Sequence, residues 1–215
     1  METISLKING VEYDVPKGST VLEAARAAKI DIPTLCYLKD VSQTGSCRMC
    51  LVEIKGGRAL QAACVYPVAE GLEIYTNSEK VRKARKTTLE LILSNHEKKC
   101  LTCVRNRNCE LQTLADELGI DQLRYEGENE KYELDCGSTS LVRDNNKCIL
   151  CRRCVAACNN QTISVIGCAE RGFKTHITST FEKDIKDVGC IFCGQCIVSC
   201  PVGALYEKND IPKVI

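Results

Sequence analysis

One cysteine spacing occurs twice in the second half of the chain, and it constrains the fold more than any other feature. Four cysteines are spaced C-x2-C-x2-C-x3-C, and the same spacing begins again 42 residues later. The two runs are Cys148, Cys151, Cys154 and Cys158, followed by Cys190, Cys193, Cys196 and Cys200. So many thiols in one short region favour metal binding as the organising interaction of this part of the chain.

Composition supports metal binding over disulfide bonds. The 215 residues include 17 cysteines and no tryptophan, and the net charge is +1. We identify neither a secretory signal nor an apolar run that could span a membrane, so we expect a cytoplasmic protein. Cysteine-rich cytosolic chains more often bind metal than form disulfides. The nearly neutral charge also argues against a nucleic-acid partner.

The repeated spacing is that of two-cluster bacterial ferredoxins, and Pro201 follows Cys200 as in that motif. In those proteins the fourth cysteine of each run binds the other cluster, and we expect it to begin a helix that points away. One 4Fe–4S cluster is therefore assigned to Cys148, Cys151, Cys154 and Cys200, and the other to Cys158, Cys190, Cys193 and Cys196. Zinc is the alternative, although four-cysteine zinc sites normally use two widely separated pairs.

The residues beside the two runs differ in charge. Arg152 and Arg153 lie beside the first run, whereas Ile191 and Phe192 lie beside the second. Because positive charge favours the reduced, more negative state of a cluster, we expect the first cluster to have the higher reduction potential. The alternative is that both arginines face solvent or a partner.

The N-terminal part of the chain has the pattern of a β-grasp. Apolar residues alternate on both sides of Asn9-Gly10, which predicts a β-hairpin. Thr20 and Glu23 predict the capping box of a helix that ends near Ala28. Further strands are expected at about 50–55, 60–65 and 72–76. Four cysteines of this region, Cys36, Cys47, Cys50 and Cys64, are candidate ligands of a 2Fe–2S cluster, with zinc as the alternative.

A third type of site lies between these regions. Helices are expected at about 78–96 and 109–118, with one histidine and three cysteines near and between them: His96, Cys100, Cys103 and Cys109. Three cysteines are one ligand short of a 4Fe–4S cluster, and His96 is placed to be the fourth. A zinc site of the same composition is the alternative. The basic run Lys80, Arg82, Lys83, Arg85 and Lys86 is interpreted as a solvated helix face, or else as a docking patch for an acidic partner.

These patterns predict an α+β chain with three cluster-binding domains. We expect a 2Fe–2S β-grasp domain at 1–77, a small helical one-His/three-Cys domain at 78–119, a linker at 120–140 and a two-cluster ferredoxin domain at 141–215. The expected cofactors are one 2Fe–2S cluster and three 4Fe–4S clusters. Outside these sites, we expect Cys168 to be a small buried residue, Cys136 to be a free thiol and His176 to lie on the surface.

In this order the motifs resemble the N-terminal electron-relay region of iron-only (FeFe) hydrogenases over essentially the whole chain. They also resemble the front part of the large iron–sulfur subunit of respiratory complex I and modules of NAD(P)-linked formate dehydrogenases. Residues 143–151, 193–196 and 200–205 carry the resemblance. In those families the matching histidine and cysteines bind the clusters, which agrees with the assignments above.

The resemblance implies a function in electron transfer. A large catalytic domain follows the relay in those hydrogenases and formate dehydrogenases, whereas this chain ends fifteen residues after Cys200. We therefore expect a non-catalytic subunit of a soluble, hetero-oligomeric oxidoreductase, with or without electron bifurcation. It would relay electrons between a flavin-bearing NAD(P)H subunit and a hydrogenase, formate dehydrogenase or ferredoxin. The alternatives are a detached or truncated relay portion of an iron-only hydrogenase or formate dehydrogenase catalytic subunit, and an iron–sulfur sensor or assembly factor.

The neutral histidine leads to a prediction about reduction potential. Imidazole carries no negative charge where a thiolate would, so His96→Cys is expected to lower the midpoint potential of its cluster, by the logic of Rieske centres. A redox titration followed by EPR measures this change. An unchanged or higher midpoint would contradict the prediction.

Overall fold

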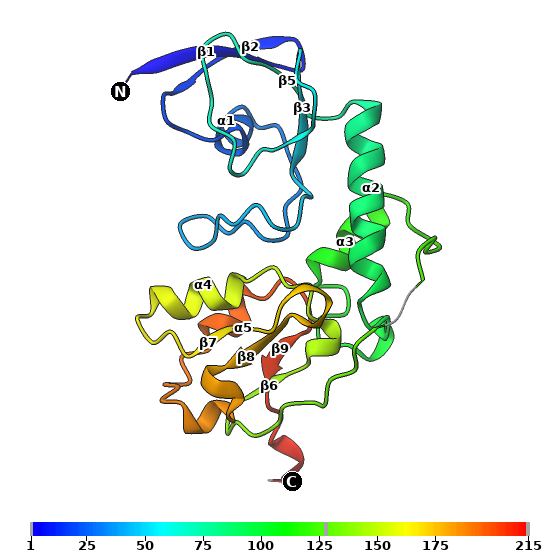
Figure 1. The fold of residues 1–215 in the computed structure, drawn as a ribbon, viewed down its shortest axis with the longest axis vertical. Helices are drawn as coiled ribbons and strands as arrows, with labels where there is room; N and C mark the ends of the chain where they lie inside the picture. The colour runs from blue at the N-terminus through cyan, green and yellow to red at the C-terminus, as the bar shows by residue number, and fades with distance from the viewer. Residues whose placement is uncertain (1, 127–128, 214–215) are drawn as a thin grey trace. The chain divides into compact units, whose positions relative to one another are not determined.

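A computed structural model describes residues 2–126 and 129–213, and every structural statement below concerns this part of the chain (Figure 1). Five residues lie outside it: Met1, Gly127, Glu128, Val214 and Ile215. The predicted linker and the ends of the first and last predicted domains are therefore described only in part. The chain folds into two compact units. The first unit consists of Met1–Tyr37 and Gln43–Leu91, and the second consists of Leu38–Ser42 and Ile92–Ile215.

The first unit is a mixed five-stranded sheet packed on a helix. Its strands are β1 (Thr3–Ile8), β2 (Val11–Pro16), β3 (Leu51–Ile54), β4 (Gln61–Ala62) and β5 (Glu73–Tyr75), in the order β2-β1-β5-β3-β4. β1 pairs antiparallel with β2 and parallel with β5, whereas β3 pairs antiparallel with both β4 and β5. Hairpin, helix and mixed sheet agree with the β-grasp pattern read from the sequence.

Local sequence signals explain where these elements turn and begin. Asn9 and Gly10 have φ values of 52° and 86°, as the two central residues of a type I′ turn require. α1 (Val21–Ala27) begins with the predicted capping box, because the Glu23 amide donates to Thr20 Oγ1 and the Thr20 amide donates to the Glu23 carboxylate. The apolar side of α1 belongs to one buried core with residues of β1, β3 and β5.

The long helix α2 (Glu79–Ser94) corrects the interpretation of the basic run. Lys80, Arg82 and Lys83 are exposed, in agreement with a solvated face. Arg85 is only 6% exposed, and its Nη2 atom donates to the Leu51 carbonyl at 2.7 Å. Arg85 is therefore a structural residue that fastens α2 to the start of β3.

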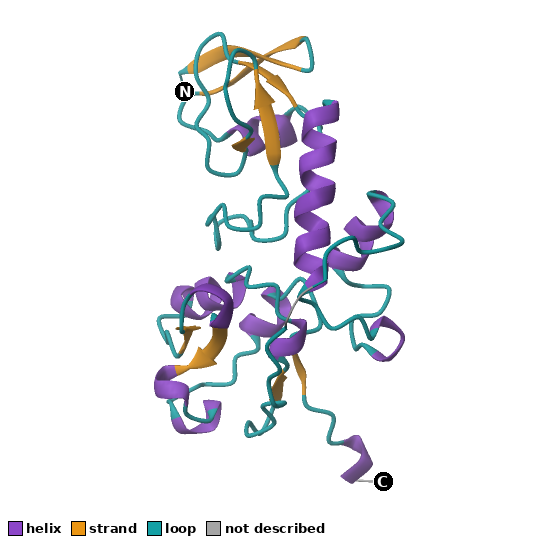
Figure 2. Cartoon of the chain, turned by 45° about the vertical axis from the view of Figure 1, so that its right-hand side comes forward, coloured by secondary structure: helices purple, strands orange, loops and turns teal. Residues whose placement is uncertain are grey.

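The second unit contains shorter elements. Its helices are α3 (Glu110–Glu117), α4 (Arg153–Asn160) and α5 (Gln195–Ser199). Its strands form two antiparallel pairs, β6 (Leu141–Arg143) with β9 (Leu205–Glu207) and β7 (Ile166–Ala169) with β8 (His176–Ser179). In Figure 1, α4 and α5 lie side by side, and Figure 2 shows how much of the remaining chain is loop.

The described part of the predicted linker is fastened to this unit. The Tyr132 amide donates to Asn146 Oδ1, and Asn146 Nδ2 donates back to the Tyr132 carbonyl. Asp135 accepts a hydrogen bond from the Arg143 guanidinium at 2.6 Å. Although it has no helix or strand, this segment is held in place by specific polar contacts.

One expectation about a single residue is wrong. Cys168 is exposed rather than buried, because the two-stranded β7–β8 sheet leaves this part of the strand uncovered. His176 is half-buried at the surface, and its Nε2 atom lies 3.1 Å from a carboxylate oxygen of Glu182. Cys136 is exposed, as a free surface thiol would be.

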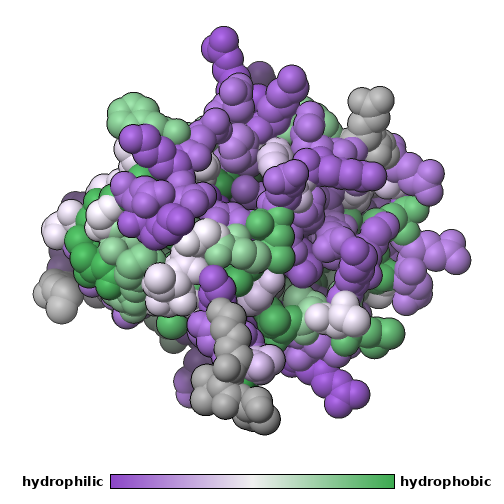
Figure 3. Space-filling model, turned by 90° about the horizontal axis from the view of Figure 1, so that it is seen from below, coloured by the Kyte–Doolittle hydropathy of each residue, from purple (hydrophilic) through white to green (hydrophobic). Residues whose placement is uncertain are grey.

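No helix among the described residues is both long and apolar enough to cross a membrane. Figure 3 shows one face of the molecule, where hydrophilic side chains predominate and apolar residues form separate patches.

The capping box provides a stability prediction. Thr20→Ala removes the side-chain acceptor of the Glu23 amide, and we expect it to lower the free energy of unfolding of the first unit by about 1 kcal/mol. Thr20→Ser keeps the hydroxyl and is the matched control. Hydrogen exchange of the α1 amides measures the difference; equal protection in both variants would show that the cap contributes nothing.

Candidate iron–sulfur sites

The first unit brings its four predicted ligands into one buried cluster of sulfur atoms. Cys36, Cys47, Cys50 and Cys64 are all buried. Cys50 immediately precedes β3 and Cys64 closely follows β4, so the antiparallel pairing of these strands places the two residues near each other. The Cys47 amide donates to the Cys36 sulfur at 3.5 Å, and Gln43 Nε2 donates to the Cys64 carbonyl at 2.6 Å.

Contacts among these thiols change their acidity. Hydrogen bonds from the side chains of Cys47 and Cys64 lower the pKa of Cys36. A hydrogen bond from Cys64 lowers the pKa of Cys50 to about 7. Hydrogen bonds with Cys36 and Cys50 raise the pKa values of Cys47 and Cys64. Two of the four thiols therefore favour thiolate, the form in which cysteine binds metal. The arrangement fits the predicted 2Fe–2S site, and the ligand roles remain predictions.

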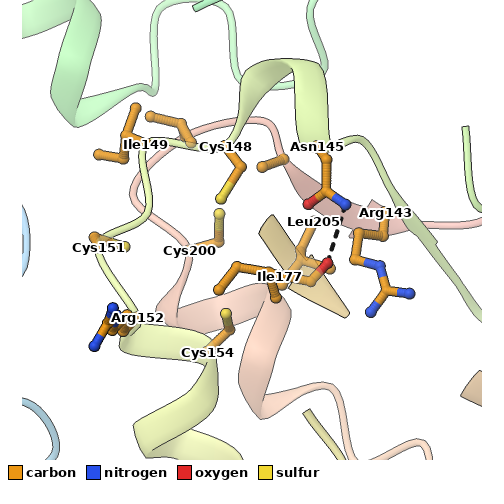
Figure 4. Close-up of a pocket in the computed structure, with 12 residues that line it drawn as sticks. Arg143, Asn145, Cys148, Ile149, Cys151, Arg152, Cys154, Ile177, Cys200 and Leu205 are labelled. Carbon is orange, nitrogen blue, oxygen red and sulfur yellow. Dashed lines mark hydrogen bonds between the residues drawn. The ribbon is translucent and has the colours of Figure 1, made fainter. Parts of the chain in front are cut away.

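In the second unit, the eight repeated cysteines line two separate cavities. The cysteines of the first cavity are Cys148, Cys151, Cys154 and Cys200, and those of the second are Cys158, Cys190, Cys193 and Cys196. Figure 4 shows the sulfur atoms of the first set directed toward a common space beside Ile177. The structure thus groups these cysteines in the same two sets that the spacing predicts.

The two cysteine loops repeat the same backbone geometry. In the first loop Leu150 and Arg152 have φ values of 53° and 62°, and at the matching positions of the second loop Phe192 and Gly194 have values of 53° and 74°. In both loops the amide two residues after the first cysteine donates to its sulfur at 3.4 Å. The left-handed residues turn each loop around its cavity.

The position of the fourth cysteines differs from expectation. They were expected to begin helices, but Cys158 lies near the end of α4 and Cys200 is the C-terminal cap of α5. The third cysteine of each run lies in the first turn of the same helix. The length of the helix therefore separates the fourth cysteine from its own run and carries it to the other cavity.

Burial keeps several of these thiols neutral while no metal is bound. It raises the pKa of Cys148 to about 12 and that of Cys196 to about 11, and it raises the pKa of Cys154 well above its usual value. Binding of a metal cluster would displace these protons, because thiolate is the ligand form.

The predicted one-His/three-Cys site lies around the start of α3. Cys100 begins a 3₁₀ turn, Cys103 ends it, and Cys109 caps α3. Burial raises the pKa of Cys109, with smaller contributions from Cys103 and Cys100, so the three thiols are near one another.

His96 is held beside the first ferredoxin loop. Burial lowers its pKa, which favours the neutral imidazole that binds metal. Its imidazole is hydrogen-bonded to the backbone of Lys147, the residue before Cys148, while its Nδ1 atom is buried without a hydrogen-bond partner among the described residues. A buried nitrogen without a partner fits a metal ligand, and the role of His96 remains a prediction.

The segment around Cys200 forms part of the wall of this site. The Arg105 guanidinium donates to the Cys200 carbonyl at 3.2 Å, and the Glu110 amide donates to the Pro201 carbonyl at 3.0 Å. A Cβ atom added to Gly203 would lie 2.5 Å from the Cys103 sulfur. A side chain at this position would therefore require the sulfur to shift.

The two arginines of the first loop have different environments. Arg153 is buried and forms a two-pronged ion pair with Glu110, at 2.6 and 2.9 Å. Arg152 is exposed and lines the first cavity. Their matching positions in the second loop are Gly194 and Gln195, 42 residues later, and not Ile191 and Phe192.

Sequence reasoning gave no role at these sites to Arg143 and Asn145 at the first cavity or to Gly203 against Cys103, although all three lie in the segments that carry the resemblance. Asn145 Nδ2 donates to the Ile177 carbonyl at 3.0 Å, the dashed line in Figure 4. These contacts join positions far apart in the chain, which the cysteine spacing does not indicate.

Among the described residues, no three His, Cys, Asp or Glu side chains are grouped to hold a single metal ion.

Gly203 provides a prediction for the site at His96. Gly203→Ala is expected to displace the Cys103 sulfur, so that the EPR signal of this cluster is lost or altered and about four iron atoms per chain are lost. Gly167→Ala is the matched control, because a Cβ there meets nothing within 4 Å and the backbone is not left-handed. Full iron content with an unchanged spectrum in Gly203→Ala would contradict the role of Cys103.

Three family models match successive parts of the chain. Residues 1–79 match a 2Fe-2S iron-sulfur cluster binding domain, and residues 85–124 match the NADH-ubiquinone oxidoreductase-G iron-sulfur binding region. Residues 147–204 match a 4Fe-4S dicluster domain. The chain therefore contains both 2Fe–2S and 4Fe–4S domains.

Curated relatives match over nearly the whole chain. The NADP-reducing hydrogenase subunit HndD of Solidesulfovibrio fructosivorans is 44% identical over 100% of this chain and 38% of its own length. The NADPH-Fe(3+) oxidoreductase subunit alpha of Geobacter sulfurreducens is 37% identical over 95% of this chain and 24% of its own length. The NADH-ubiquinone oxidoreductase 75 kDa subunit of Reclinomonas americana is 35% identical over 95% of this chain and 29% of its own length. The chain thus spans about a quarter to two fifths of these relatives.

A solved structure matches over most of both chains. It is a crystal structure of an NAD+-reducing [NiFe]-hydrogenase in the H2-reduced state, with a TM-score of 0.90 and 31% identity over 95% of this chain and 87% of the other. Similarity of this extent, together with the three family models, confirms the resemblance to hydrogenase and complex I iron–sulfur proteins. The chain belongs to the iron–sulfur family that this hydrogenase chain shares with HndD and with the 75 kDa protein of NADH-ubiquinone oxidoreductase.

Proposed function

We propose that this chain is the electron-relay subunit of a multisubunit oxidoreductase. When bound, iron–sulfur clusters supply one-electron transfer, and the protein holds them, excludes water and adjusts their potentials. The observation that carries this proposal is the pair of cavities, each lined by three cysteines of one run and the fourth cysteine of the other.

The proposal includes one 2Fe–2S cluster and three 4Fe–4S clusters, held by the four ligand sets given above. Cys36, Cys47, Cys50 and Cys64 would hold the 2Fe–2S cluster. One 4Fe–4S cluster would be held by His96, Cys100, Cys103 and Cys109. The two cavities of the second unit would hold the others. We also propose a cytoplasmic location, where reducing conditions keep these thiols available for metal.

The proposed partners follow the relatives. HndD is described as a subunit of an NADP-reducing hydrogenase, and the Reclinomonas americana relative as a subunit of an NADH-ubiquinone oxidoreductase. By analogy, the donor or acceptor on one side would be a flavin-bearing NAD(P)H subunit. On the other side would be a hydrogenase, a formate dehydrogenase or a ferredoxin.

A second candidate is that these residues are the relay portion of a longer catalytic chain. It is favoured by the match to only 38% of HndD, although all of this chain takes part in that match. The separate subunit is favoured by the solved hydrogenase chain, 87% of which is covered. The mass of the native polypeptide decides between them, because a value near 23.8 kDa supports the subunit and a much larger value supports the second candidate.

Metal content tests the relay itself. Protein purified without oxygen is expected to contain about fourteen iron atoms per chain, from one 2Fe–2S and three 4Fe–4S clusters, and negligible zinc. Cys200→Ser and Cys158→Ser should each disturb a different 4Fe–4S signal, since the two residues line different cavities. Zinc in place of iron, or turnover of a small molecule by the isolated chain, would overturn the proposal.

A further inference from the structure

The two ferredoxin loops match in backbone geometry but differ in charge at one position. Arg152 and Gly194 occupy equivalent places, both left-handed and both N-terminal caps of the following helix, α4 or α5. For a residue with a side chain this conformation is strained, whereas glycine adopts it without strain. The first loop therefore retains a strained arginine where its twin shows that glycine suffices.

The other positive charges near the first cavity are balanced. Arg143 lines the cavity but pairs with Asp135 at 2.6 Å. Arg153 pairs with Glu110 at 2.6 Å, and Lys147 pairs with Asp144 at 2.8 Å. Each pair joins one positive and one negative side chain, so the three pairs together add little net charge beside the first cavity.

Arg152 is different, because its guanidinium has no carboxylate partner among the described residues. Figure 4 shows Arg152 on the side of the cavity near Cys151, opposite Arg143, with its guanidinium directed away from the sulfur atoms. The first cavity thus has one uncompensated cation at its edge.

The second cavity has no charged lining residue among those described. Its lining consists of its four cysteines with apolar residues, two glutamines and Gly194. Ile191, Phe192 and Ile163 are typical of this lining. The charge asymmetry between the cavities therefore reduces to a single exchange, Arg152 for Gly194.

We propose that Arg152 is a tuning residue that makes the cluster of the Cys148 cavity the more easily reduced of the two ferredoxin-type clusters. Reduction adds one negative charge, which a nearby cation stabilises. Because Arg152 is exposed, its effect decreases as added salt screens its charge. This inference rests on the proposed function, since it requires 4Fe–4S clusters in both cavities. The sequence led us to expect that both Arg152 and Arg153 raise the potential of this cluster. The structure assigns this effect to Arg152 alone, because Arg153 is paired with Glu110.

Reciprocal exchange tests the proposal in the full chain. Arg152→Gly gives the first loop the residue of its twin and is compatible with the left-handed backbone. Gly194→Arg adds the charge to the second loop, where a Cβ meets nothing within 4 Å and the twin loop already holds an arginine in this conformation. Arg152→Lys keeps the charge and is the control. Midpoint potentials are measured by redox titration followed by EPR.

The expected results differ for each variant. Arg152→Gly lowers the midpoint of one 4Fe–4S signal, and Gly194→Arg raises the midpoint of a different one. Arg152→Lys leaves both close to their original values, and the shifts diminish in high salt. If Gly194→Arg does not retain its clusters, Arg152→Gly and Arg152→Lys decide the question by themselves.

Other outcomes overturn the inference. Unchanged midpoints in Arg152→Gly, an upward shift, or a shift of the same signal by both exchanges would each contradict it. Absence of iron–sulfur clusters from the unmodified protein is a separate result, seen before any titration, and it would overturn the proposed function instead.

Discussion

The crossing of Cys158 and Cys200 between the two cysteine runs is the constraint on which the second unit depends. Each cavity is completed by the residue at the far end of the other run's helix. α4 and α5 must therefore lie side by side for either cavity to exist. The β6–β9 pair joins the chain just before the first run to the chain just after the second, which closes the arrangement.

The one-His/three-Cys segment is built onto this arrangement. His96 bonds to the residue before Cys148, Arg105 holds the Cys200 carbonyl, and Gly203 leaves room for a sulfur. Burial of an arginine is costly unless its charge is paired, and the Arg153–Glu110 pair meets this need while joining α4 to α3. Contacts that place the predicted ligands thus also link neighbouring candidate sites.

Much of this architecture could be predicted from local sequence. The hairpin at Asn9-Gly10, the capping box at Thr20 and the division of the repeated cysteines depend on short-range patterns, and all agree with the structure. Short-range sequence patterns could not indicate which side chains are buried or which residues far apart in the chain lie close together. Arg85 is buried although it lies in a charged run, Cys168 is exposed although its neighbours are apolar, and the fourth cysteines end helices rather than begin them.

The shared cavities have a consequence for how the protein is made. Cys148 leaves the ribosome 52 residues before Cys200, which completes its cavity. A nascent chain therefore has only three of the four cysteines of this cavity until synthesis reaches Cys200. The second cavity likewise combines Cys158 with three cysteines that are made at least 32 residues later. Neither set of four cysteines can be complete until the second run has been synthesised.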